Sequence, residues 1–147
     1  MIIIKYDSFV TCLNALEQAD FNKACRDEIY RMGVLCKFNQ TFELACKALQ
    51  EVLRFGNVDG AEIATPREII KLGCDNGYIA DADSWQLMIE KRSQDIYFCD
   101  DEVKKEFVVM IKDCFVSKFK KLAEILEKKL FLTNSDSDSE FVRGHRY

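Results

Sequence analysis

The sequence predicts an all-α protein, an up-and-down four-helix-type bundle with one additional short helix. Apolar residues recur every three or four positions along most of the chain, and no stretch shows the alternation typical of a strand. One proline and six glycines leave room for long, uninterrupted helices. A chain of 147 residues can bury a single hydrophobic core, and we expect one domain over residues 1–132.

The first part of the chain predicts a short helix followed by a long one. An apolar stripe indicates a helix over about residues 6–19, and a longer stripe indicates a second over about residues 27–54, ended near Gly56. The first stripe consists of Phe9, Leu13 and Leu16. The second consists of Ile29, Met32, Leu35, Phe38, Phe42, Ala45, Leu49 and Leu53.

The stretch "ATPREII" has the signature of a helix start. Thr65 takes the N-cap position, Pro66 follows it, and Glu68 completes a capping box. Gly77 suits the left-handed residue that ends this helix.

Asp81 or Asp83 is expected to cap the next helix. Trp85, Met88 and Ile89 form its apolar stripe, and Arg92 lies near its end.

A last long helix is expected over about residues 102–131, capped by Asp100 and Asp101. Its core stripe consists of Phe107, Ile111, Cys114, Phe115, Phe119, Leu122, Leu126 and Leu130. Further apolar residues widen this stripe, namely Val108, Val109, Met110 and Val116. We expect them to face a second subunit in a homodimer; the alternative is burial inside one bundle. Residues 133–147 form an acidic tail of low complexity, for which we expect disorder.

Composition points to a cytoplasmic protein. Seven scattered cysteines indicate free thiols, and no cysteine or histidine spacing suggests zinc or another cofactor. No apolar run is long enough for a membrane span, and the start "MIIIKYDSF" is too short for a signal peptide. A net charge of −4 gives no general attraction to nucleic acid. The lysines of the last helix, among them Lys104, Lys105 and Lys112, indicate a solvated face rather than an RNA track.

Several candidate residues have two interpretations each. Arg92 beside Tyr97 could clamp a phosphate, or could only stabilise the end of its helix. Glu43 could form a surface pair with Lys47, or could be a partly buried site carboxylate.

The aspartates before the last two helices could be metal ligands, but helix capping accounts for each pair. A cysteine nucleophile would need the only histidine, His145, which is the third residue from the end of the sequence.

Three blocks of the sequence together resemble the HEPN superfamily, and within it the small family of nucleotidyltransferase substrate-binding proteins. They are "FNQTFELACKAL" (38–49), "ATPREIIKLGCDNGYI" (64–79) and "WQLMIEKRSQDIYFCDDE" (85–102), and the resemblance covers about residues 5–130. It implies a dimeric helical bundle, paired with a separate minimal nucleotidyltransferase in prokaryotic toxin–antitoxin modules. Active members are ribonucleases with the motif Arg-x4-6-His, often followed by x-Tyr, and the partner adds AMP to that tyrosine.

This motif is degenerate in the present chain. Arg92 takes the arginine position, but Tyr97 replaces the histidine and Cys99 replaces the tyrosine. Histidine exchanges protons near neutral pH, whereas tyrosine, with an ordinary pKa of about 10, does not. The resemblance therefore implies a non-catalytic subunit that associates with a minimal nucleotidyltransferase and binds nucleotide or RNA near Arg92, Tyr97 and Glu43. The alternative is a divergent HEPN ribonuclease toxin.

Overall fold

The computed structural model describes the backbone of residues 4–93 and 95–143 and the side chains of residues 4–92 and 95–130. All regular structure in these residues is helical, which confirms the predicted all-α class. The elements are α1 (Ile4–Glu17), α2 (Phe21–Arg26), α3 (Glu28–Phe55), η1 (Ala61–Ile63), α4 (Pro66–Asp75), α5 (Ala82–Ser93), η2 (Ile96–Phe98), α6 (Asp101–Met110), η3 (Ile111–Phe115) and α7 (Val116–Arg143). Helix α2 and the two 3₁₀ turns, η1 and η2, were not predicted.

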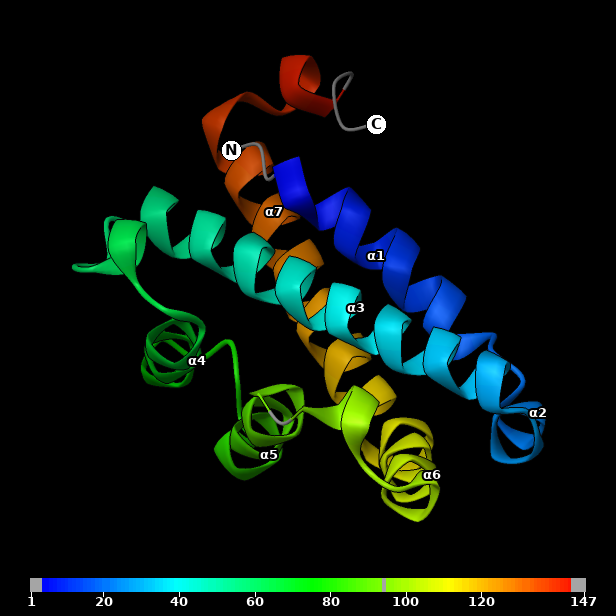
Figure 1. Ribbon diagram of the computed structural model, residues 1–147. Helices are drawn as coiled ribbons and strands as arrows, with labels where there is room; N and C mark the ends of the chain where they lie inside the picture. The colour runs from blue at the N-terminus through cyan, green and yellow to red at the C-terminus, as the bar shows by residue number, and fades with distance from the viewer. Residues whose placement is uncertain (1–3, 94, 144–147) are drawn as a thin grey trace.

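The long helix α3 is the centre of the bundle, and it contacts α1, α2, α4, α6 and α7. Helix α1 lies antiparallel to α3, and α7 crosses behind α3 (Figure 1) and also contacts α1. Helices α4, α5 and α6 are seen nearly end-on in the same view, so they cross α3 rather than run along it. The face of α3 opposite α1 is therefore covered by a row of three shorter helices.

The core is built around aromatic side chains from α3, α6 and α7. Phe38 is fully buried, and its ring centroid lies 5.0 Å from that of Phe107, 5.4 Å from Phe115 and 5.8 Å from Phe119. Phe9 brings α1 to the same cluster, with its ring edge-on to Phe119 at 6.1 Å. Such edge-to-face and tilted pairs are the geometries that aromatic quadrupoles favour.

Most of the predicted helix signals are confirmed. Thr65 and Glu68 form the expected capping box, with both reciprocal hydrogen bonds present, and Gly77 has a left-handed φ of +84°. Asp27 caps α3 through its carboxylate, and α3 ends at Gly56. Asp81, rather than Asp83, accepts a hydrogen bond from a backbone amide of the first turn of α5, at 3.1 Å.

Two expectations about capping and burial were wrong. Asp100 occupies the N-cap position of α6, but its side chain makes no capping hydrogen bond; Asp101 instead pairs with Arg31, at 3.5 Å. Ile29, predicted at the start of the apolar stripe of α3, is 78% exposed. The buried face at this end of α3 carries Arg31 and Val34 instead.

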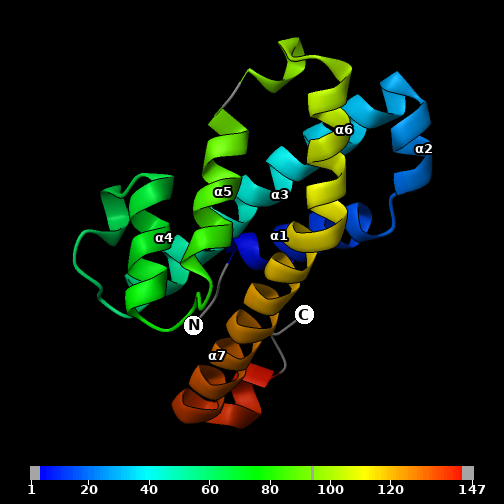
Figure 2. The ribbon, with the colours of Figure 1, turned by 90° about the horizontal axis from the view of Figure 1, so that it is seen from below.

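The predicted last helix is interrupted by a π-helical turn, η3, between α6 and α7. Helix α7 continues from it in a different direction from α6, as Figure 2 shows. A π-turn adds one residue to the helix and is a common cause of such a bend. The extra residue also explains much of the wide apolar band, because Val108 and Val116 are both buried within the subunit.

Only part of that band remains available for a second subunit. Val109 is 46% exposed and Met110 is half-buried. The homodimer stays a prediction, with a smaller apolar surface behind it than the sequence suggested. Disorder over residues 133–147 also stays a prediction, because the side chains from residue 131 onward and the backbone of residues 144–147 lie outside the described residues.

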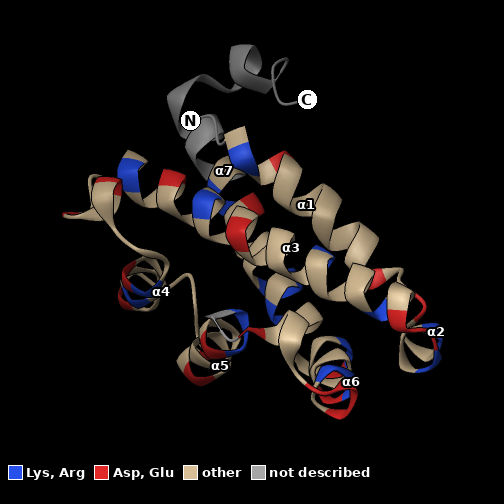
Figure 3. Ribbon diagram, viewed as in Figure 1, with Lys and Arg blue, Asp and Glu red and all other residues tan. Residues whose placement is uncertain are grey.

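Charged residues of both signs are interspersed over the described helices in the view of Figure 3. Several lysines of the last helix have acidic partners: Lys120 with Glu17 at 2.7 Å, and Lys105 with Glu102 at 3.5 Å. Lys104 departs from the predicted solvated face, since it is only 8% exposed. Among the described residues no helix is long and apolar enough to cross a bilayer.

Candidate ligand-binding site between α3, α4 and α5

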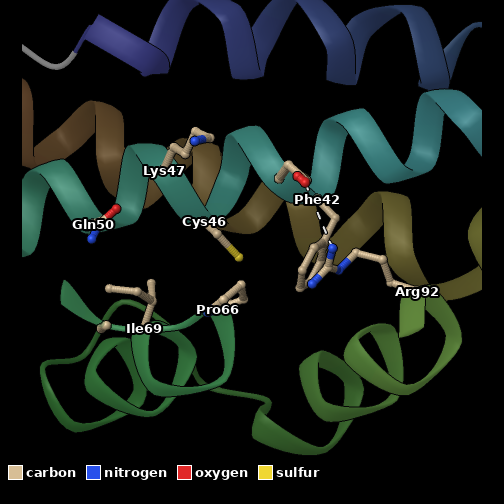
Figure 4. Close-up of a pocket in the computed structure, with 9 residues that line it drawn as sticks. Phe42, Cys46, Lys47, Gln50, Pro66, Ile69 and Arg92 are labelled. Atoms are coloured by element: carbon tan, nitrogen blue, oxygen red, sulfur yellow. Dashed lines mark ion pairs between the residues drawn. The ribbon is translucent and has the colours of Figure 1, made fainter. Parts of the chain in front are cut away.

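A pocket of about 190 Å³ opens where α3 meets the start of α4 and the end of α5 (Figure 4). Two predicted site residues, Arg92 and Glu43, lie in its wall. The complete lining consists of Phe42, Glu43, Cys46, Lys47, Gln50, Ala64, Pro66, Ile69 and Arg92. The capping box at Thr65 fixes the start of α4, and it therefore also fixes the positions of Pro66 and Ile69 in the pocket wall.

Arg92 extends from the last turn of α5 across the face of Phe42. The central carbon of its guanidinium group lies 5.1 Å from the centroid of the Phe42 ring, a cation–π distance. Its Nη1 atom is 3.8 Å from a carboxylate oxygen of Glu43, a long ion pair. The Nε atom is buried and has no hydrogen-bond partner. The guanidinium is thus fixed in orientation but retains donor capacity.

Glu43 is paired with Arg92 rather than with Lys47, so the surface pair within α3 was the wrong interpretation. Its side chain is 50% exposed and lines the pocket, so its role as a site carboxylate stays a prediction. A half-exposed carboxylate at 3.8 Å gives the arginine little stabilisation and can turn away from it.

Cys46 and Gln50 complete the wall formed by α3. The Cys46 thiol points toward α4 (Figure 4). Burial raises its pKa to about 12, although the positive charge of Arg92 acts in the opposite direction. At neutral pH this thiol is a neutral, apolar group. Gln50 donates a hydrogen bond to the carbonyl of Ala61 at 2.7 Å, which ties the loop before α4 to α3.

Tyr97 lies on η2, and its hydroxyl reaches Asn39, which is one helical turn before Glu43 on α3. Its hydroxyl accepts a hydrogen bond from the Asn39 side-chain amide at 2.8 Å and lies 3.6 Å from the Cys36 sulfur. Burial, and secondarily the nearby Cys36, raise the pKa of the Tyr97 phenol. The phenol therefore stays protonated over an even wider pH range than an ordinary tyrosine.

A comparison with protein-family models gives one match that spans most of the chain. Residues 4–128 match the family described as "Nucleotidyltransferase substrate binding protein like". The chain belongs to this family. A search of curated proteins found no match.

The pocket draws on all three sequence blocks that suggested the family. Cys99, the third motif position, is half-buried and its thiol donates to the carbonyl of Asp95 at 3.5 Å. The structure thus brings Arg92 and Glu43 together, puts Tyr97 beside Asn39, and leaves Cys99 bonded within its own turn.

Sequence reasoning did not assign Cys46 and Gln50 of the pocket wall, or Asn39 beside Tyr97, to the site. Asn39, Glu43, Cys46 and Gln50 recur at spacings of three and four, so a polar stripe existed in the sequence. It was obscured because Cys46 reads as apolar and because the stripe adjoins the core residue Phe42. A row of polar residues next to the apolar stripe was the available signal.

The other candidate groups of the chain have structural roles or lie outside the described residues. Asp81 forms an ion pair with Lys118 at 2.9 Å and accepts from the Ser84 hydroxyl at 2.8 Å. These bonds, that from Lys118 first, lower the pKa of Asp81 to about 2. No group of three potential metal ligands occurs in the described part of the chain. His145 lies outside the described residues, and all seven cysteines are free.

Proposed function

We propose that this protein is a non-catalytic, HEPN-type subunit that docks a minimal nucleotidyltransferase and holds its nucleotide or acceptor substrate at the Arg92 pocket. Membership of the substrate-binding family supports the partner class. The observation that carries the proposal is Arg92 itself, an arginine stacked on Phe42 with an unpaired Nε at the wall of a pocket.

Arginine suits this task because its planar guanidinium carries five donors that match a phosphate or carboxylate. Among the described residues, Arg92 has one ion pair, the long one to Glu43 at 3.8 Å. An incoming anion can form short, charge-assisted hydrogen bonds there, which are stronger than the existing pair. Glu43 then becomes available to accept from a hydroxyl or amino group of the same ligand. The Phe42 ring meanwhile keeps the guanidinium plane in position.

The alternative function, a divergent ribonuclease toxin, assigns proton transfer to Tyr97. The alternative gives Tyr97 the part of a weak acid, and the raised pKa of this phenol makes it a still poorer proton donor as well as unsuited to be a general base near neutral pH. Its hydroxyl also accepts from Asn39, which occupies an oxygen lone pair that a base would use. These two features favour the binding function.

Docking is tested by co-expressing the chain with a minimal nucleotidyltransferase from the same organism, and we expect one to be encoded in the adjacent gene. The tagged chain should retain the nucleotidyltransferase through affinity purification, and the pair should elute together on size exclusion. Separate elution of the two proteins at micromolar concentration would refute the partner assignment. Light scattering of the chain purified without the nucleotidyltransferase tests the predicted homodimer.

The ribonuclease alternative has its own test. Expression of the chain without a partner should leave growth normal, and purified protein should leave RNA intact. Growth arrest that disappears on Arg92→Ala would establish the toxin and contradict the binding function.

A further inference from the structure

A second pocket lies on the other side of the molecule's aromatic core, between the loop joining α4 to α5 and the first turns of α7. Its volume is about 310 Å³, within the range of small-ligand sites. Figure 2 shows the loop beside this part of α7. No predicted site residue belongs to it, and the Arg92 pocket shares none of its lining.

The floor of this pocket is apolar and partly aromatic. Ile79, Trp85 and Leu122 line it, and they are only 6%, 3% and 1% exposed. Tyr78 stands half-buried at the rim. Two aromatic side chains beside an apolar floor are suited to receive a flat ring, since rings stack in offset or edge-on arrangements.

The rim of the pocket is cationic. Lys118 is neutralised by Asp81, whose carboxylate is also occupied by Ser84. Lys121, on the next turn of α7, is exposed and lines the pocket without an acidic partner among the described residues. Lys129 adds a second positive charge, with its ammonium 5.6 Å from the centre of the Tyr78 ring. The local charge is thus positive on a chain whose net charge is −4.

We propose that this pocket, named here the Tyr78–Lys121 pocket, binds a free mononucleotide. The nucleobase lies against Tyr78 and the apolar floor, and the phosphate is held at the rim by Lys121, with Lys118 beside it. An aromatic ring that bears a phosphate is the ligand class that matches both features. This site is separate from the Arg92 pocket, so its occupation does not depend on the nucleotidyltransferase.

The protein carries an internal reporter for this binding. Trp85 is the only tryptophan in the sequence and lines the Tyr78–Lys121 pocket. Its ring centroid is also 6.2 Å from that of Phe42, the residue under Arg92. The fluorescence of Trp85 therefore reports directly on a ligand in the Tyr78–Lys121 pocket. A ligand in the Arg92 pocket can also change it through Phe42, so variants are needed to separate the two sites.

The experiment titrates the full chain with AMP at low ionic strength and follows Trp85 fluorescence, excited where adenine does not absorb. Saturable quenching by AMP is expected, with adenosine and inorganic phosphate each binding at least tenfold more weakly. Octanoate tests an aliphatic acid as the occupant. No saturable change with millimolar AMP, or tighter binding of octanoate than of AMP, would overturn the proposal.

Variants then locate the response. Lys121→Ala removes one charge-assisted contact and should weaken AMP binding about tenfold. Lys112→Ala, at an exposed lysine outside the pocket, is the matched control and should bind as the parent protein does. Lys121→Ala should weaken AMP binding by the same factor in a chain that also carries Arg92→Gln, because the two pockets share no lining residue.

Each outcome of this series is decisive. Loss of the response in Arg92→Gln but not in Lys121→Ala would place the nucleotide at the Arg92 pocket and overturn this inference alone. Equal effects of Lys112→Ala and Lys121→Ala would mean that AMP binds by non-specific charge attraction, which would also overturn the inference. Thermal melting of each variant confirms that it is folded.

Discussion

Arg31 is the buried charge on which the arrangement of α2 and α6 against α3 depends. Its side chain is 3% exposed. The guanidinium donates to the carbonyls of Ala24 at 2.9 Å and Cys25 at 3.1 Å, both in the last turn of α2. It also pairs with Asp101 at the start of α6, at 3.5 Å. One side chain thus satisfies the end of one helix and holds the start of another.

Replacing Arg31 by methionine keeps most of the apolar stem but removes every donor. Hydrogen bonds to a charged group contribute about 1.5–3 kcal/mol each, and two buried carbonyl contacts are lost. The added apolar area of methionine offsets about 1–2 kcal/mol of this loss. We therefore expect Arg31→Met to lower the free energy of unfolding by about 3 kcal/mol. For a domain of this size that corresponds to a fall in Tm of about 6–12 °C.

Asp101→Asn is the informative comparison for this prediction. Asp101 is 54% exposed, so its ion pair is screened by solvent, and its loss should cost about 1 kcal/mol or less. Urea denaturation followed by circular dichroism measures both variants. A loss below about 1 kcal/mol for Arg31→Met, or equal losses for the two variants, would refute the role assigned to the α2 carbonyls.

Two further predictions concern Cys46, in the wall of the Arg92 pocket, and the packing of α4 on α3. Burial raises the pKa of Cys46 to about 12 from 9.0, so its thiolate should be about a thousandfold scarcer near neutral pH. Alkylation followed by peptide mass spectrometry should therefore show Cys46 reacting far more slowly than the exposed Cys36. The unfolded thiol loses its proton near pH 9.0 and the folded one only near 12, so stability should fall as pH rises through that window; equal labelling of both cysteines would contradict this environment. A Cβ at Gly73 would lie 2.8 Å from a terminal methyl of buried Leu49, so Gly73→Ala should destabilise the fold by about 1–3 kcal/mol. Gly33→Ala, with open space around the added Cβ, should instead be stabilising by about 0.5–1 kcal/mol; thermal melts that rank the two variants the other way would disprove the close packing of α4 on α3.

The helices that the sequence predicted well are those with both a period and an end signal. The helix opening at Thr65 has a capping box and the one ending at Gly56 has a long apolar stripe, and both lie where expected. Helix α2 has six residues, fewer than two turns, so it shows no apolar period. The π-turn η3 adds one residue to a continuous helix, and nothing in its local composition marks it.

The same limits apply to the site. Arg92 was found because it stands in a family motif, and Glu43 because it is a carboxylate flanked by the apolar residues Phe42 and Leu44; the two do lie together. The surrounding residues could not be predicted, because Phe42 and Cys46 read as ordinary core positions. Whether an arginine pairs with an acidic residue of another helix depends on the distance between the two helices, and the sequence does not contain that distance. The partner of Asp101 was missed for this reason: helix capping is local, whereas Arg31 lies on another helix.

The Arg92 pocket is tested most directly by the transfer activity of the docked nucleotidyltransferase. Its KM for the bound substrate should rise about tenfold or more when the subunit carries Arg92→Gln, because a charge-assisted contact to the substrate is lost. Arg26→Gln, at an exposed arginine on α2, should leave that KM unchanged while both variants still dock. An unchanged KM with Arg92→Gln would contradict the account, because it would mean that the substrate does not bind at this arginine.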